Sequence, residues 1–361
     1  MTAGAKATPP SPDAVPGLTA LPGPVTSPGP RPPIPHWPER MVALPGGDPV
    51  FVAETAAGVR DDEKDPVLCV HGMAGAATNW TDFMAELAPE FACAAVDLPG
   101  SGQSPPKGPN GYSIRALANT VIGLIEVRGD GPVHLVGNSM GGAVSVKVAA
   151  LRPDLVRTLT LISPALPDRL PHPSLLRFPM LATPWLGGWM LRRADNVPAE
   201  ARVRIMLSTV YYDWRTSVHP DRIAAEVDQT RRRDKLPYSD DVLIGAARAI
   251  AVEYLRPATR SLWRDAERIR VPVLAIYGSH DRLVNPRMAA RAARTFRDVR
   301  VLVLPRTGHV AMLEHPVEVA ARFREMVEPA PGTHVRETHA RRETARGMPG
   351  TDVGFTPITN F

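Results

Sequence analysis

Short apolar runs alternate with longer amphipathic stretches along most of the chain. Short apolar runs bounded by turn residues are typical of buried strands, whereas apolar positions recurring every three or four residues predict helices. The helical pattern is clear after Ser113, where Ile114, Leu117 and Val121 fall on one face. The apolar runs predict strands at 67–70, 92–96, 133–136, 156–162, 272–277 and 299–304, and the helical patterns predict helices near 79–87, from 113, and at 143–151, 287–296 and 316–327.

The order of these elements predicts the architecture. Met41–Leu44 and Val50–Ala53, separated by Pro45–Asp48, are expected to form an antiparallel hairpin at the edge of a sheet. After the hairpin, strands alternate with helices, which favours an α/β fold with a mostly parallel central sheet flanked by helices. Residues 165–256 interrupt this alternation after the sixth predicted strand and have helical periodicity throughout.

The first part of this interruption is unusually apolar. Leu175–Leu181 and Pro184–Leu191 are its most apolar stretches. Three interpretations stay open: these residues pack the segment onto the rest of the protein, line an apolar substrate pocket, or form a peripheral contact with a membrane surface.

Composition indicates how the two ends of the chain behave and which partners are excluded. Many of the 40 prolines lie within residues 1–39, and residues 331–361 are rich in Arg, Thr and Gly with little apolar periodicity. We therefore expect a disordered Pro-rich head and a flexible tail. The net charge of +5 comes from scattered arginines, which argues against a nucleic-acid partner. The densest basic cluster, Arg231–Arg233 with Lys235, is expected to be a solvated helix end, with an acidic partner as the alternative.

The cysteines and the amino terminus bear on location. Cys69 and Cys93 each fall inside a predicted strand, where a thiol usually acts as a small apolar filler. Their number and spacing indicate neither a disulfide framework nor a metal site. Pro and Gly interrupt the amino-terminal segment every few residues, which is unlike a secretory signal. No run of about 20 apolar residues indicates a membrane span, so a cytoplasmic location is expected. The sequence implies no metal and no organic cofactor.

Ser139 carries the strongest chemical signal. It lies between Gly137 and Gly141, directly after the strand run that ends at Val136 and before a helical stretch. A serine on a sharp strand-to-helix turn needs neighbours without side chains two positions before and after it. This pattern predicts a nucleophile elbow, although a serine with a structural role in a Gly-rich turn is the alternative.

Two further residues follow in the order nucleophile, acid, histidine. Asp281 comes just after the strand predicted at 272–277, and His309 comes on the loop after the strand at 299–304. Ligands and catalytic groups gather at the carboxyl ends of strands in open α/β sheets. Asp281 would orient His309, and His309 would take the proton of Ser139. The alternatives are that Asp281 only caps the following helix and that His309 is an exposed loop residue.

With these motifs in this order, residues 40–328 resemble the α/β-hydrolase superfamily. His71–Gly75 is similar to its oxyanion loop, and Asp97–Ser104 to its loop after the next strand. The resemblance implies an α/β-hydrolase fold whose helical cap follows strand 6. It also implies that the backbone N–H groups of Met73 and Met140 stabilise the oxyanion. The expected parts are a head (1–39), a core (40–164 and 257–330), a cap or lid (165–256) and a tail (331–361). His71 and Asp97 are interpreted as loop supports, and His280 and His315 as neighbours without an assigned role.

The resemblance also implies a reaction class. We expect a serine hydrolase that cleaves carboxylic esters or thioesters with an apolar acyl or alcohol part through an acyl-enzyme. The elbow is also similar to that of carbon–carbon hydrolases that act on ring-fission products. Those enzymes tend to have Gly-Pro-Gly where this chain has Met73–Gly75, and Trp where it has Val310. A cofactor-free haloperoxidase and a non-catalytic ligand-binding protein on the same fold are further alternatives.

Overall fold

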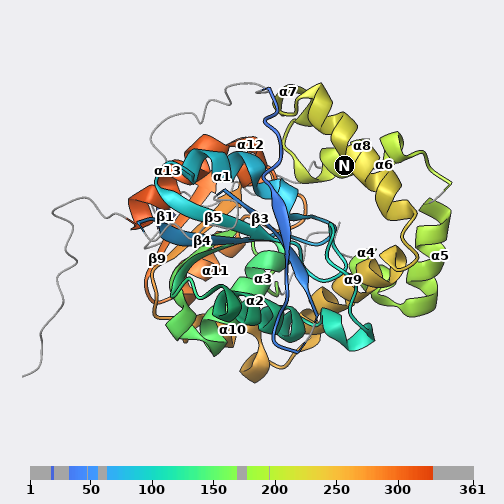
Figure 1. Ribbon diagram of the computed structural model, residues 1–361. Helices are drawn as coiled ribbons and strands as arrows, with labels where there is room; N and C mark the ends of the chain where they lie inside the picture. Colours follow the sequence, from blue (N-terminus) through green and yellow to red (C-terminus); the bar gives the residue numbers. More distant parts are fainter. Residues whose placement is uncertain are drawn as a thin grey trace, which may run out of the picture. The chain divides into compact units, whose positions relative to one another are not determined.

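A mainly parallel sheet forms the centre of the computed structural model, which describes residues 18–19, 32–46, 48–55, 63–168, 177–194 and 196–327 (Figure 1). Within these residues the strand order is β1-β9-β8-β7-β6-β4-β5-β3-β2. Only β5–β3 and β3–β2 pair antiparallel. The strands are β1 (Leu18–Thr19), β2 (Glu39–Val42), β3 (Val50–Glu54), β4 (Asp65–Val70), β5 (Phe91–Val96), β6 (Val133–Asn138), β7 (Val156–Ile162), β8 (Val273–Gly278) and β9 (Val299–Leu304).

The predicted strands and hairpin are confirmed. Each of the six apolar runs forms a strand, and β2 and β3 form the hairpin with Met41 opposite Phe51. The helices outside the insertion are α1 (Thr81–Leu87), α2 (Ile114–Arg128), α3 (Met140–Leu151), α10 (Leu262–Ala266), α11 (Met288–Thr295), α12 (Ala311–Glu314) and α13 (Pro316–Val327). Short 3-10 helices occupy Ala77–Trp80, Pro109–Tyr112, Pro153–Leu155 and Ala258–Arg260. Ser113 caps α2 by accepting a hydrogen bond from the N–H of Ala116.

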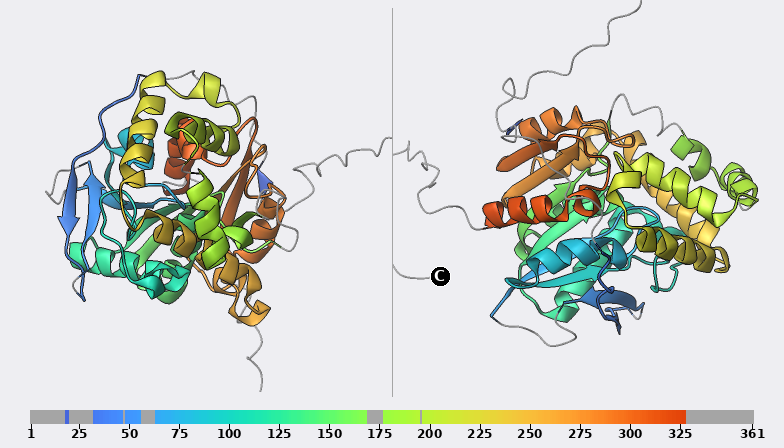
Figure 2. Two further views of the ribbon diagram at one scale, coloured as in Figure 1. Left: turned by 90° about the vertical axis from the view of Figure 1, so that its right-hand side faces the viewer. Right: turned by 90° about the horizontal axis from the view of Figure 1, so that it is seen from above.

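Helices cover both faces of the sheet (Figures 1 and 2). Alternate residues of each strand enter two separate apolar clusters: Leu68 and Leu135 pack with α2 and α3, whereas Val67 and Val136 pack with α1 and α13. Because both faces are buried, the central strands are mostly apolar instead of alternating regularly with polar residues. Cys69 and Cys93 are free thiols within this buried sheet.

The insertion follows β7, which is the sixth strand that the sequence predicts, because β1 was not predicted. Its helices lie to one side of the sheet, at the right of Figure 1. They are α4 (Arg177–Ala182), α5 (Pro184–Ala194), α6 (Ala199–Val210), α7 (Trp214–Ser217), α8 (Pro220–Asp234) and α9 (Ser239–Leu255). The cap limits at 165 and 256 stay predictions.

The amino-terminal head differs in part from its prediction as disordered over residues 1–39. Leu18–Thr19 pairs in parallel with β9. Further on, the indole Nε1 of Trp37 donates a hydrogen bond of 3.1 Å to the carbonyl oxygen of Thr81. These residues therefore have defined contacts, at an open edge of the sheet and at a partly buried site for the Trp37 ring. The limits and the disorder of the head as a whole stay predictions. The predicted tail, 331–361, lies outside the described residues.

Candidate active site

The turn that carries Ser139 has the strained backbone expected of an elbow. Ser139 joins β6 to α3 with φ 53° and ψ −117°, a conformation that non-glycine residues rarely adopt. A Cβ on Gly137 would lie 2.6 Å from the carbonyl oxygen of Gly141, and one on Gly141 would lie 2.5 Å from that of His71. Neither position therefore has room for a side chain, as the sequence pattern predicts.

Asp281 and His309 form a buried pair, each with 4% exposure. His309 Nδ1 lies 2.8 Å from Asp281 Oδ2. The other carboxylate oxygen, Oδ1, accepts the N–H groups of Leu283 and Val284 at 2.8 and 2.9 Å. Burial by itself raises the pKa of Asp281, but the imidazole and the two N–H groups outweigh burial and hold this pKa below its usual value. The carboxylate thus holds the turn after β8 and contacts the imidazole at the same time. His309 is not an exposed loop residue.

Two side chains that the sequence analysis missed hold the His309 loop. Asn138 Nδ2 donates to the carbonyl oxygens of Ile162 and His309, at 3.0 and 3.1 Å. Asn138 is adjacent to Ser139, so it ties the elbow to the histidine loop. The only sequence signal for Asn138 was its place beside the serine.

Glu314 is the second such residue, and it links the histidine loop to the end of α6. Its carboxylate accepts the N–H of Gly308 at 2.7 Å and the N–H of Tyr212 at 2.8 Å. In addition, His309 N donates to Val210 O at 2.6 Å. Burial raises the pKa of Glu314 to about 7. No sequence motif marked this residue.

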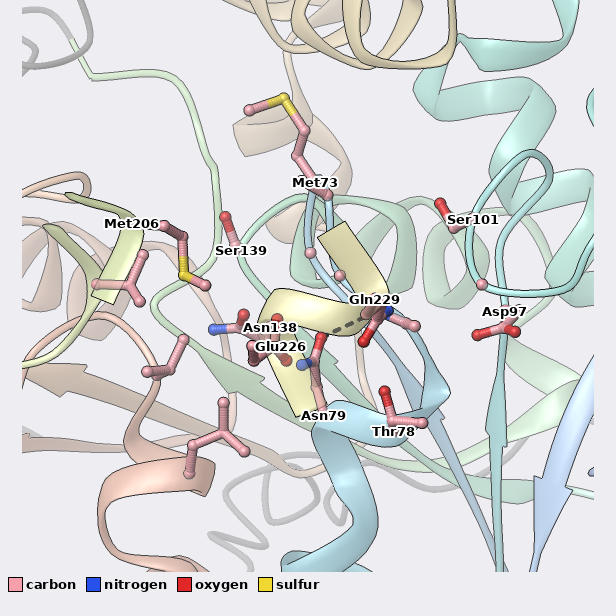
Figure 3. A pocket seen from close by; sticks show the side chains of 18 of the residues that line it. Met73, Thr78, Asn79, Asp97, Ser101, Asn138, Ser139, Met206, Glu226 and Gln229 are labelled. Atoms are coloured by element: carbon pink, nitrogen blue, oxygen red, sulfur yellow. Dashed lines mark hydrogen bonds between the residues drawn. The ribbon is translucent and has the colours of Figure 1, made fainter. Parts of the chain in front are cut away.

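Ser139 and His309 both line a cavity of about 1100 Å³ between the sheet and helices α6, α8 and α9 (Figure 3). Within the described ranges, no hydrogen bond joins their side chains. Hydrogen bonds between catalytic groups are often long before a substrate binds. The structure therefore joins two of the three predicted residues directly and brings the third to the same cavity.

Met73 and Met140 border the cavity on either side of the serine turn. Among the described residues, the backbone N–H of neither methionine donates to a protein acceptor. A Cβ on Gly72 would lie 3.1 Å from Ser139 Cβ, so the loop of Met73 packs directly against the serine. Backbone N–H groups left without acceptors beside a nucleophile are suited to bind a developing oxyanion.

The supporting roles expected of His71 and Asp97 agree with their contacts. His71 is fully buried; its Nε2 accepts the N–H of Leu98 at 3.0 Å and its Nδ1 lies 2.7 Å from Gly72 O. Asp97 accepts the N–H groups of Ala77 and Gln103 at 2.6 and 2.9 Å. Both residues use their polar atoms to hold loops, and this leaves the loop of Met73 fixed beside Ser139.

The cavity has walls of different chemistry. One wall is apolar and comes mainly from the sheet loops, α6 and α9: Met73, Met206, Val242, Leu243, Ile250 and Val284. A second wall is polar and comes from α8 with the end of α6: Tyr211, Arg222, Glu226, Gln229, Thr230 and Arg233. Further polar residues line the cavity from the sheet loops and α1, among them Thr78, Asn79, Asp82, Asp97 and Ser101. An apolar pocket wall was one of three open interpretations of Leu175–Leu181 and Pro184–Leu191, and the residues of these stretches that the structure describes are not among those that line this cavity. No sequence pattern indicated the second, polar wall. Arg231 of the basic cluster points outward to Glu200 and Asp228, whereas Arg233 borders the cavity.

A family model described as alpha/beta hydrolase fold matches residues 65–316, more than half of the 361 residues. The chain belongs to the α/β hydrolase family. Comparison with named relatives agrees that this α/β hydrolase is an enzyme. It is 27% identical over 270 residues to a pimeloyl-[acyl-carrier protein] methyl ester esterase of Neisseria meningitidis, a match that covers 74% of this chain and 95% of the relative.

Solved structures share the fold of this α/β hydrolase. Cfl2 from Burkholderia cenocepacia superposes with a TM-score of 0.69 and 22% identity, over 84% of this chain and all of that chain. A 2-hydroxy-6-oxo-6-phenylhexa-2,4-dienoate hydrolase from Rhodococcus superposes with a TM-score of 0.62 and 22% identity, over 80% and 99% of the two chains. At these identities the likeness concerns the fold alone.

Proposed function

We propose that the protein is a serine hydrolase of carboxylic esters or thioesters, with Ser139 as nucleophile, His309 as base and Asp281 as the group that orients the histidine. The observation that carries this proposal is the buried contact of His309 with Asp281 at the cavity that also holds Ser139 on its strained turn. A hydroxyl on such a turn points away from the backbone, where a substrate carbonyl can reach it.

The chemistry follows from the hydrogen bonds. Asp281 holds the proton of His309 on Nδ1, which leaves Nε2 free to accept the proton of Ser139 as its oxygen attacks the carbonyl carbon. The N–H groups of Met73 and Met140 stabilise the negative charge on the carbonyl oxygen. His309 then protonates the leaving alcohol or thiol, and an acyl-enzyme remains. Water attacks this ester by the same route, which releases the acid and restores the hydroxyl of Ser139.

Two observations favour an ester over a carbon–carbon bond as the substrate. One relative that matches over most of its length is named as a methyl ester esterase. Val310 also occupies the position after His309, where carbon–carbon hydrolases tend to carry tryptophan. The elbow and the fold shared with the Rhodococcus hydrolase keep carbon–carbon cleavage as the second candidate. Haloperoxidase activity and ligand binding without turnover have no separate support in the site.

The test is hydrolysis of p-nitrophenyl esters of increasing acyl length by wild type and by Ser139→Ala. We expect turnover by the wild type with an optimum chain length, and loss of at least about 10⁴-fold in kcat for the variant. Ser113→Ala is the matched control, because it removes a serine hydroxyl that caps α2 away from the cavity. Full activity of Ser139→Ala, or a folded wild type that hydrolyses no ester in the series, would overturn the proposal.

A membrane contact of the inserted helices extends this proposal. Trp185 and Trp189 lie one turn apart on α5, with 75% and 49% exposure, and Met180 on α4 is 45% exposed. Arg192 and Arg193 are exposed at the end of the same helix, and Arg193 lies over the Trp189 ring at 5.2 Å. Exposed tryptophans beside arginines suit the interface of an anionic bilayer. Within the described ranges, no helix is long and apolar enough to cross a membrane.

Sedimentation with vesicles tests this contact. We expect binding to phosphatidylcholine vesicles that contain phosphatidylglycerol and about tenfold weaker binding after Trp185→Ala with Trp189→Ala. Ile205→Ala is the control, because Ile205 is 62% exposed on α6. Equal binding of all three proteins to these vesicles, or no binding of the wild type, would refute the contact.

A further inference from the structure

Helix α8 carries two stripes of opposite character on its inner side. Ile223 and Val227 pack into the apolar cluster that also contains Leu207 of α6. The adjacent stripe, which carries Glu226 and Gln229, faces the cavity that holds Ser139 (Figure 3). Arg222 and Arg233 of the same helix also line this cavity. Inward faces of helices in globular proteins are normally apolar. The polar side chains of this stripe therefore have to form hydrogen bonds with groups in the cavity and not with the protein core.

Four polar side chains on this wall have no such partner in the protein. Tyr211 and Thr230 are 7% and 6% exposed, and Glu226 and Gln229 are partly buried. None of the four side chains makes a hydrogen bond to another described residue. Burial raises the pKa of the Tyr211 phenol and of the Glu226 carboxyl. All four side chains line the cavity with free hydrogen-bonding groups, so this wall is suited to a ligand that both donates and accepts hydrogen bonds.

The charges on the wall indicate the kind of ligand. Glu226 lies one helical turn after Arg222 and two turns before Arg233, so the carboxyl has a guanidinium on either side. Arg222 Nη2 is paired with Asp82 at 3.0 Å, whereas burial lowers the pKa of Arg233. A substrate carboxylate would be repelled by Glu226, and a substrate ammonium by the two arginines. A neutral group with hydroxyls meets neither repulsion.

We infer that Tyr211, Glu226, Gln229 and Thr230 form a subsite for a neutral, hydroxyl-bearing part of the substrate, while the wall of Met206, Val242 and Ile250 takes an apolar acyl chain. The inference rests on the proposed ester hydrolysis at Ser139. It narrows the substrate class to esters of apolar acids with polyhydroxy alcohols such as glycerol. The alcohol would leave after acylation, and the acyl chain would remain on the serine.

The experiment compares glycerol monobutyrate with propyl butyrate, which has the same length but lacks the two hydroxyls. We expect kcat/KM of the wild type to favour the glycerol ester by about 10 to 100-fold, roughly tenfold for each well-made hydrogen bond. Glu226→Leu should reduce this preference by about tenfold, and Gln229→Leu should also reduce it. Because Glu226 makes no hydrogen bond to the protein, its replacement by leucine is not expected to unfold α8. Asp228→Leu, on the solvent side of α8, is the matched control and should keep the preference.

The outcomes distinguish failure of the hydroxyl subsite from failure of the proposed ester hydrolysis. Equal kcat/KM values for the two esters, with turnover that depends on Ser139, would overturn the subsite and leave the esterase intact. A preference for monomethyl succinate that disappears in Arg233→Gln would assign the wall to an anion and overturn the inference. No turnover of either ester would overturn both proposals. Binding of glycerol monobutyrate to Ser139→Ala, weakened by Glu226→Leu in calorimetry, would support the subsite without relying on turnover.

Discussion

Replacing Asp281 by asparagine changes the hydrogen-bond pattern of the His309 imidazole while keeping the size of the side chain. In the wild type, Oδ1 accepts two backbone N–H groups and Oδ2 lies 2.8 Å from His309 Nδ1. The single oxygen of asparagine will stay on the N–H groups of Leu283 and Val284, because an amide NH₂ there would face two donors. The NH₂ group then faces Nδ1, which must become an acceptor, so the imidazole proton moves to Nε2.

An imidazole with its proton on Nε2 has no lone pair with which to take the proton of Ser139. Loss of the correct tautomer in a Ser-His-Asp triad costs about 10⁴-fold in kcat, which corresponds to about 5.5 kcal/mol in activation free energy. We expect Asp281→Asn to lose activity on a p-nitrophenyl ester by this order, with little change in KM.

Steady-state kinetics at pH 7 to 8 with an unfolding measurement check this prediction. Asp265→Asn is the matched control: its carboxylate is also largely buried, but it pairs with Lys147 of α3 and does not border the cavity. We expect that variant to keep nearly all activity. If folded Asp281→Asn kept more than about a tenth of the wild-type kcat, the assigned role of Asp281 in orienting the imidazole would be wrong.

Three further substitutions test the surroundings of the site. Gly141→Ala should destabilise the fold by about 3 kcal/mol or more in urea unfolding, because its Cβ would overlap the carbonyl oxygens of Val70 and His71 at the end of β4. Asn138→Asp should destabilise the protein at pH 7, since a carboxylate would face two carbonyl oxygens, and the loss should shrink when acid protonates that carboxyl. The folded pKa of Glu314, about 7, lies above its unfolded value of 4.5, so the neutral form favours folding. This contribution to the unfolding free energy, on the order of 3 kcal/mol, is fully present below the unfolded pKa and is lost as pH rises through about 7. Glu314→Gln should not show this loss of stability.

Controls for two of these three tests come from the same chain. Gly108→Ala should leave stability nearly unchanged, because a Cβ there meets nothing within 4 Å. Glu325→Gln removes an exposed carboxylate from α13 and should keep the wild-type pH dependence. A stable Gly141→Ala, an Asn138→Asp equally stable at pH 5 and pH 8, or parallel stability curves for wild type and Glu314→Gln would contradict the reasoning given for each.

The strands and the serine turn could be predicted because they depend on local order. A strand buried on both faces is mostly apolar, so β7 and β9 are visible as short apolar runs with the predicted bounds although each carries one exposed arginine. The turn at Ser139 needs glycines at fixed offsets whatever the rest of the chain does. Asp281 and His309 were found for the same reason, since each follows a recognisable strand.

Other contacts depend on segments far apart in the chain, and no local pattern marks them. Asn138 reaches a carbonyl oxygen 171 residues away, and Glu314 links the histidine loop to a backbone N–H 102 residues earlier. β1 pairs with β9 only because the sheet leaves that edge open. These contacts decide how the His309 loop is held and which end of the sheet is covered.

The sequence by itself therefore determined the sheet, the serine turn and the order of nucleophile, acid and histidine, because each follows from residues next to one another. Only the tertiary structure decided that the polar stripe of α8, including Glu226 and Gln229, faces Ser139 across a shared cavity. Helical periodicity shows which residues share a face, but the direction of that face is set by how Ile223 and Val227 pack against the rest of the molecule.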